Sequence, residues 1–126
     1  MTSRRRGPSE RLREVCLSIP HAEELETWGA PTYRVRGKIF AMERDDVAGR
    51  PAVWCKAPPG SQSVLVHADP DRFFAPPYVG PKGWVGMWLD KRPDWSEVER
   101  LVRRSFMLVA PRKLAKGLAG PQSSQE

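Results

Sequence analysis

An acidic segment near the N-terminus carries the side chains best suited to acid–base chemistry. His21 precedes Glu23, Glu24 and Glu26, and a histidine beside carboxylates can act as a general acid or base. Glu24 and Glu26 flank Leu25, however, and such alternation is typical of the solvent-facing side of a β-strand. We therefore interpret the segment as an exposed strand and assign no catalytic residue to it.

The motifs of common enzyme classes are missing from the sequence. Gly80-Pro81-Lys82-Gly83 lacks the spacing of a phosphate-binding P-loop, and no Gly-x-Ser-x-Gly nucleophile elbow occurs. Cys16 and Cys55 form no Cys-x-x-Cys pair or Cys/His cluster, so we predict buried free thiols and no metal site. The sequence therefore predicts a binding protein without a cofactor, and an enzyme of unknown reaction stays as an alternative.

Positive charge is the most informative feature of the composition. The 126 residues include 21 Lys and Arg against 15 Asp and Glu, a net charge of +6, and the pI is about 9.8. Such a balance favours acidic partners, among them nucleic acid. Arg4, Arg5 and Arg6 begin the chain either as a solvated tail or as an arm that contacts phosphates.

A surface that mixes cations with aromatic rings is the predicted binding site, because cations bind phosphates and flat rings stack on unpaired bases. If the helices cover one face of the predicted sheet, the other face would show Arg34, Trp54, Lys56, Trp84 and Trp88. The predicted nucleic-acid-binding residues are Arg34, Arg36, Lys38, Lys56, Lys82, Trp84, Arg100, Arg103 and Arg104. Two alternatives remain open: the tryptophans pack inside the protein, and the helical arginines form a solvated face.

The elements that must position these residues centre on the stretch from Pro76 to Val109. A proline-rich segment leads into a strand over residues 82–90, in which Trp84 and every second residue after it share one face. Asp94, with the glutamate three residues later, forms a capping box for an amphipathic helix that ends before Pro111.

Three upstream strands with short connections predict an antiparallel meander. These strands cover residues 32–35, 38–43 and 51–57. Arg36-Gly37 fits a two-residue hairpin turn between the first two. The turn sets a register in which Tyr33 faces Phe40, and Phe40 and Met42 then point into the core.

Two further helices, which Ser9 and Ser61 can cap at their N-termini, complete the predicted elements. The pattern predicts an α+β fold: a single two-layer domain with N-terminal, middle and C-terminal helices packed on an antiparallel sheet. We expect this domain over residues 8–116, between a basic disordered tail at 1–7 and a second disordered tail at 117–126. No apolar run approaches the ~18 residues of a membrane span, so we expect a cytoplasmic protein without a membrane partner.

The order of several short motifs resembles that of the MmcQ/YjbR-like family over residues 10–115. The motifs are Glu23-Glu24, Trp28 to Ala41, Lys56, Asp69-Pro70, Phe73, Pro76 to Gly80, Gly83 to Gly86, Asp94-Trp95 and Leu108 to Pro111. The resemblance implies an α+β fold similar to that of secretion chaperones and to the frataxin-like CyaY shape. Family members are commonly labelled DNA-binding, and no catalytic motif is defined for them. The residues that match the motifs are interpreted first as fold-defining: Trp28, Gly29, Pro31, Phe40, Lys56, Tyr78 and Trp84.

Three functional hypotheses follow. The first is binding of DNA or another nucleic acid through the basic and aromatic surface. The second is a protein-interaction or chaperone-like module that forms a homodimer through a self-complementary apolar patch. The third is a small-ligand-binding or enzymatic role in a pocket near His21, Glu24, Tyr78 and Trp84.

Overall fold

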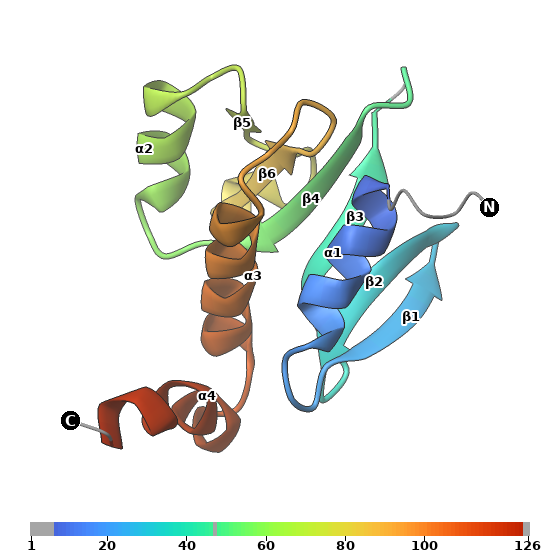
Figure 1. Ribbon diagram of the computed structural model, residues 1–126. Coiled ribbons are helices and arrows are strands. Elements are labelled where there is room, and N and C mark those ends of the chain that lie inside the picture. Colours follow the sequence, from blue (N-terminus) through green and yellow to red (C-terminus); the bar gives the residue numbers. More distant parts are fainter. Residues whose placement is uncertain (1–6, 47, 125–126) are drawn as a thin grey trace.

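The computed structural model describes residues 7–46 and 48–124 of the chain. Its helical elements are α1 (Pro8–Leu17), α2 (Ser61–Ala68), the 3-10 turn η2 (Gly80–Lys82), α3 (Trp95–Val109) and α4 (Arg112–Ser124). Its strands are β1 (Glu23–Thr27), β2 (Ala30–Val35), β3 (Lys38–Asp45), β4 (Pro51–Lys56), β5 (Phe73–Phe74) and β6 (Trp84–Trp88). Together they form the predicted α+β fold (Figure 1).

All six strands belong to one antiparallel sheet in the order β1-β2-β3-β4-β6-β5. The two-residue connections after β1 and β2 are Trp28-Gly29 and Arg36-Gly37. Both residues of each turn have positive φ, from 51° to 81°, as a type I′ hairpin turn requires. The predicted turn at residues 36–37 is confirmed, and the structure adds a second turn of the same kind.

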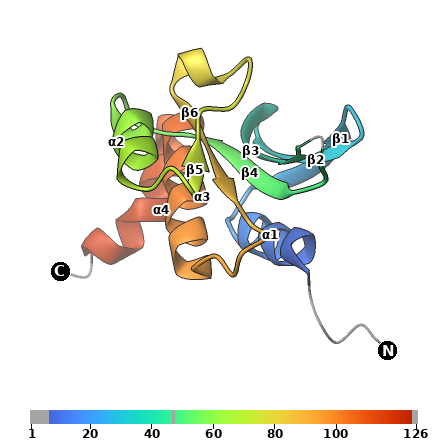
Figure 2. The same cartoon turned by 90° about the horizontal axis from the view of Figure 1, so that it is seen from above.

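Helices α1 and α3 pack on one face of the sheet, which we call the helix-covered face (Figure 1). The main hydrophobic core lies between these helices and the sheet. Within it the ring of Phe106 on α3 meets Phe40 on β3 edge to face, with centroids 5.3 Å apart. We call the opposite side the open face; the chain around η2 rises on that side (Figure 2).

A buried serine fastens α3 to the sheet. The hydroxyl of Ser105 donates to the carbonyl oxygen of Phe40 at 2.6 Å and accepts the backbone N–H of Lys56 at 2.9 Å. Ser105 is fully buried, so these two bonds satisfy its polar group inside the core.

The predicted register of the β2–β3 hairpin is correct next to the turn, where Arg34 pairs with Ile39, and wrong beyond that pair. An irregularity in the pairing makes Tyr33 pair with Ala41 rather than with Phe40. Phe40 and Ala41 therefore both belong to the main core, and Met42 belongs to the cluster on the open face. A β-bulge inserts one extra residue into a strand, and each inserted residue moves the following side chains to the other face. This is why the predicted core position of Met42 is incorrect.

The N-terminal caps of α1 and α2 also differ from the prediction. In α1, Gly7 occupies the cap, and the hydroxyl of Ser9 donates instead to a carboxylate oxygen of Glu43 at 2.8 Å. In α2, Gly60 occupies the cap with φ of 86°, and Ser61 is the first helical residue. Helix α1 thus begins two residues, and α2 one residue, before the position that a serine cap predicts.

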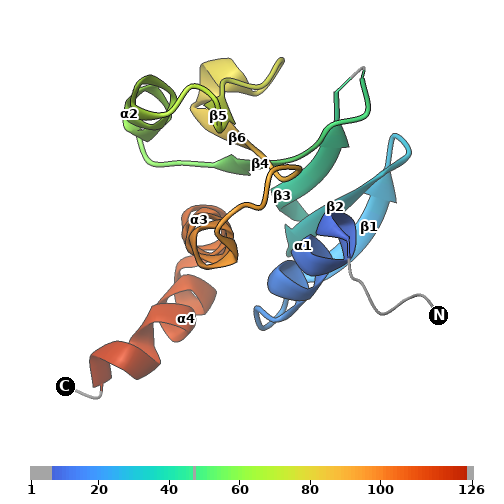
Figure 3. The ribbon, with the colours of Figure 1, turned by 45° about the horizontal axis from the view of Figure 1, so that its top comes forward.

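The C-terminal part of the chain contains more helix than the sequence predicts. Asp94 caps α3 as predicted, because its carboxylate accepts a backbone N–H at 3.0 Å. Beyond Pro111, α4 extends from the far end of α3 (Figure 3), although we expected a disordered tail from residue 117. Leu114 and Leu118 pack against the core, and this anchoring accounts for the helix. Residues 1–6 and 125–126 of the predicted tails lie outside the described residues.

Candidate ligand-binding groove on the open face

The open face of the sheet carries a second, smaller apolar cluster centred on Met42, Trp54 and Trp84. Side chains alternate along β4, so Val53 and Cys55 enter the main core while Trp54 faces the other way. The predicted alternation is therefore confirmed in this strand. Trp54 and Trp84 are only 8% and 9% exposed, so the packing interpretation of these tryptophans is the correct one.

Two exposed aromatic rings stand beside this cluster. Trp28, in the β1–β2 turn, is 75% exposed, and Tyr78, in the loop before η2, is 87% exposed. Both have positive φ, 54° and 68°, which is uncommon for large side chains. With the cluster they form a groove of about 450 Å³, which we call the aromatic groove. Its lining residues are Trp28, Ile39, Met42, Arg44, Trp54, Tyr78, Val79 and Trp84.

A second hollow of about 320 Å³ continues the aromatic groove across β4 and β6. It shares Arg44 and two aromatic side chains with the groove and adds Phe74 and Trp88. The rings of Phe74 and Trp88 are stacked with centroids 4.4 Å apart. Gly86 leaves room for this stack, because a Cβ there would lie 2.2 Å from the Phe74 ring. The open face is thus lined with rings over most of its width.

Cations lie next to these rings. The guanidinium carbon of Arg44 is 5.3 Å from the ring centroid of Trp54, and that of Arg50 is 3.9 Å from the centroid of Trp88. Lys56 follows two residues after Trp54 on β4 and so points to the same face. Within the described chain neither Arg44 nor Lys56 forms an ion pair. Both charges are therefore available to an anionic ligand.

The structure separates the nine predicted nucleic-acid-binding residues into two groups. Those on the sheet and around η2 are Arg34, Arg36, Lys38, Lys56, Lys82 and Trp84. The second group, Arg100, Arg103 and Arg104, lies on α3, across the sheet from the chain around η2 (Figure 2). The nine residues therefore do not form one continuous surface.

Arg34, a member of the first group, forms hydrogen bonds that stabilise the sheet. Its guanidinium donates to the hydroxyl oxygens of Thr27 at 2.9 Å and Thr32 at 3.2 Å, and to the carbonyl of Gly37 at 3.4 Å. These bonds tie β2 to β1 and to the following turn. Its donors are therefore already engaged, unlike those of Lys56.

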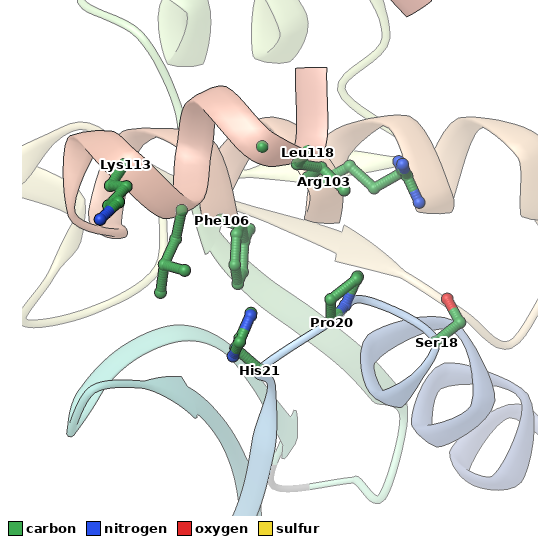
Figure 4. Close-up of a pocket in the computed structure, with 9 residues that line it drawn as sticks. Ser18, Pro20, His21, Arg103, Phe106, Lys113 and Leu118 are labelled. Carbon is green, nitrogen blue, oxygen red and sulfur yellow. The ribbon is translucent and has the colours of Figure 1, made fainter. Parts of the chain in front are cut away.

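The four residues of the predicted small-ligand pocket lie in separate places. His21 lines a different pocket, of about 410 Å³, in which its ring points toward Phe106 (Figure 4). Glu24 accepts a hydrogen bond from Arg13 of α1 at 2.6 Å, on the helix-covered face. The other two residues, an exposed tyrosine and a packed tryptophan, line the aromatic groove. The structure thus brings only this pair together.

Burial on the helix-covered face controls the titration of three acidic groups. It raises the pKa of the Cys16 thiol well above its usual value and that of Cys55 to about 12. Burial also raises the pKa of Glu43, and the hydrogen bond from Ser9 partly offsets this rise. Both thiols are free and buried as predicted, so neither has the exposure or the thiolate character of a reactive cysteine.

Comparison with known proteins identifies the family. The YjbR family model matches residues 17–108, which is most of the chain, so the protein belongs to the YjbR family. The crystal structure of Deinococcus radiodurans protein DR2400, with domain DUF419, is similar with a TM-score of 0.67 at 22% sequence identity. The match covers 77% of this chain and 74% of that chain. At this identity the likeness establishes the α+β fold alone, and no curated protein matches the chain.

No helix in residues 7–46 or 48–124 is long and apolar enough to cross a membrane. In the same part of the chain, no group of three or more His, Cys, Asp or Glu side chains is placed to hold a metal ion.

Sequence reasoning missed several residues of the aromatic groove. The strand predicted over residues 38–43 ends before Arg44, Met42 is predicted to face the core, and Trp28 is interpreted as fold-defining. One signal was present: Trp28-Gly29 occupies a two-residue turn in which Asn-Gly is the preferred pair. A tryptophan in that position is out of place for the turn and points to another role.

Proposed function

We propose that this protein binds single-stranded nucleic acid in the aromatic groove. The observation that carries the proposal is the combination of two exposed rings, Trp28 and Tyr78, with an apolar floor and the Arg44 side chain. Lys56 lies on the same face of the sheet beside this lining, and neither cation forms an ion pair within the described chain. Proteins that bind single strands combine these same parts, because each unpaired base offers a flat face and each nucleotide a phosphate.

The choice of a single strand follows from the rings. Bases in a duplex are already stacked on their neighbours, whereas unpaired bases can stack on Trp28 and Tyr78. Each such contact contributes about 1–3 kcal/mol. Lys56 and Arg44 then bind phosphates beside the groove, and the exposed Lys82, next to the groove in η2, extends the path of the strand.

The backbone at Trp28 supports the same assignment. A left-handed conformation is unfavourable for a large side chain, and strained residues cluster at functional sites. Here the strained position presents a ring that is three-quarters exposed, so the fold gains little burial from it. Binding of a base gives this ring a function that packing does not.

Fluorescence anisotropy of a labelled oligothymidylate, measured at two salt concentrations, tests the proposal. We expect binding at low salt that weakens steeply as salt rises. Lys56→Gln should weaken binding, and it should reduce the slope of the logarithm of the binding constant against the logarithm of the salt concentration by about one, the value for one phosphate contact. Arg112→Gln removes the same charge from an exposed position on α4 and is the matched control, with an effect well below that of Lys56→Gln.

Trp28→Asn separates binding from folding. Asparagine is preferred in a type I′ turn, so the variant should be as stable as the wild type or slightly more stable while it binds less tightly. Absence of binding at low salt would refute the proposal. Equal losses in the Lys56→Gln and Arg112→Gln variants would also count against it.

A second candidate, a protein-interaction module, is favoured by the edge strand β1. Leu25 is exposed there, and β1 pairs with a described strand on one side only. An unpaired edge can add a strand from a partner, although Glu24 and Glu26 oppose this by their charge. Light scattering tests the homodimer version: a dimeric mass that Leu25→Lys converts to a monomer supports it, and a monomeric wild type contradicts it.

The two buried free thiols fit the reducing cytoplasm, where either candidate function would operate.

A further inference from the structure

Arg104 on α3 has hydrogen-bond donors that no group in the described chain satisfies. Its Nε and Nη2 atoms are both buried and both lack a partner. Buried donors are nearly always paired in proteins, so an exception requires an explanation.

The two unpaired atoms form one edge of the guanidinium group. Their N–H bonds point the same way and match two oxygens of a single carboxylate or phosphate group. Arg50 shows the same edge in use, because its Nε and Nη2 donate to the two carboxylate oxygens of Asp90 at 2.7 and 3.1 Å. Arg104 therefore has the geometry of an anion receptor with no anion supplied by the described chain.

Positive charge surrounds this edge. Arg104 lines a groove of about 510 Å³ beside α2 and α3, which we call the α2–α3 groove, and Arg100 and Arg103 line it as well. Glu97 is the acidic residue in the lining, and Arg72 neutralises it through a contact of 2.5 Å. Arg103 also pairs with Glu99 on the same helix at 3.6 Å, so the excess positive charge of the groove comes mainly from Arg100 and Arg104.

The rest of the lining is apolar. Leu65 of α2 and Leu101 and Met107 of α3 complete the groove. An anion with an organic body would fit such a surface better than a free inorganic ion, because the body removes apolar area from water.

Helix α2 forms part of the wall of this groove through Leu65. None of its eight residues is fully buried, although Leu65 and Val66 pack against the main core. A small shift of α2 would therefore widen the groove beside Arg104 and expose few buried side chains.

We propose that the α2–α3 groove binds an organic phosphate monoester. The phosphate receives two hydrogen bonds from the Arg104 edge and lies close to the other two arginines, while its organic part contacts the leucines and Met107. A phosphate dianion matches the charges of Arg100 and Arg104, which form no ion pair within the described chain, better than a carboxylate with one charge does. The site lies on α3, away from the aromatic groove, and goes beyond the proposed function.

Thermal unfolding with phenyl phosphate, inorganic phosphate or benzoate tests this site. A ligand that binds only the folded state raises Tm with concentration. We expect phenyl phosphate to raise Tm most, inorganic phosphate less, and benzoate least. Arg104→Met should abolish the phenyl phosphate response without lowering Tm in the absence of ligand, because it removes unpaired buried donors.

Two further variants sharpen the result. Arg104→Lys keeps the charge but loses the two-donor edge, so it should bind phenyl phosphate at least tenfold more weakly. Arg50→Met breaks an occupied edge, so it should lower Tm and yet keep the full phenyl phosphate response.

A measurement on the wild type avoids any dependence on variants. The Nε–H resonance of Arg104, assigned in arginine-labelled protein, should shift when phenyl phosphate is added. The proposal would be overturned if phenyl phosphate changed neither the Tm nor the Arg104 resonance of the wild type. An Arg104→Met variant that responds like the wild type would overturn it as well.

Discussion

The two faces of the sheet use their aromatic residues in different ways. On the helix-covered face Phe40 and Phe106 are fully buried and touch edge to face. On the open face two packed tryptophans form a floor, and the exposed rings of Trp28 and Tyr78 stand beside it. The same alternating strands therefore supply a core on one side and a candidate binding surface on the other. Substitutions on the first face should change stability, and those on the second should change binding.

Phe106→Ala should give the largest effect on stability. It removes a fully buried ring and leaves a cavity, so we expect the free energy of unfolding to fall by about 3–5 kcal/mol. Urea denaturation measures this change. Tyr78→Asn is the matched substitution on the open face and should stay within about 0.5 kcal/mol of the wild type. A large loss of stability in the tyrosine variant would break the contrast between the two faces.

Gly86→Ala should give an intermediate effect that originates on the open face. The new Cβ would meet the Phe74 ring at 2.2 Å, so the ring must leave its stack with Trp88. We expect the free energy of unfolding to fall by about 1–3 kcal/mol. Urea denaturation monitored by tryptophan fluorescence measures this change. Phe74→Ala removes the obstacle, so the double variant should be no less stable than Phe74→Ala alone. If the stability losses of the two single variants add in the double variant, the glycine is required for a reason other than the Phe74 ring.

Glu43→Gln should give the smallest effect, one that depends on pH. Burial raises the pKa of Glu43 above its usual value of 4.5 in the folded protein. The folded state then binds more protons than the unfolded state in this range, so stability falls as pH rises from the usual pKa through the raised one. Glutamine stays neutral and retains an oxygen for the Ser9 hydroxyl. Urea titrations should therefore show a more stable variant at pH 7 and equal stabilities below pH 4; the opposite order at pH 7 would exclude this explanation.

The sequence predicts those parts of the fold that depend on local periodicity. Alternation along β4 and β6 correctly places Trp54 and Trp84 on the same face of the sheet, and Asp94 marks the start of α3. The irregular pairing of β2 with β3 leaves no such mark, because it depends on how Phe40 and Ala41 both fit under the helices. Without knowledge of this irregular pairing, the face of the sheet on which Met42 lies cannot be predicted.

The candidate site was predictable only by residue type. Aromatic and basic residues were recognised, but their division between the two sides of the sheet depends on tertiary structure. Arg50 and Arg104 illustrate the limit: both are arginines in a basic chain, yet one edge is filled by Asp90, forty positions away, and the other is unpaired. Only the folded arrangement distinguishes them.

Photochemical crosslinking tests the central claim, that the open face binds single-stranded nucleic acid, most directly. An oligothymidylate that carries 5-iodouracil is irradiated with the protein, and the modified peptides are identified by mass spectrometry. We expect crosslinks on the peptides that contain Trp28 and Tyr78, since bases stacked on these rings lie within bonding distance. Crosslinks confined to α3 and α4, or none at a concentration that saturates binding, would contradict the claim.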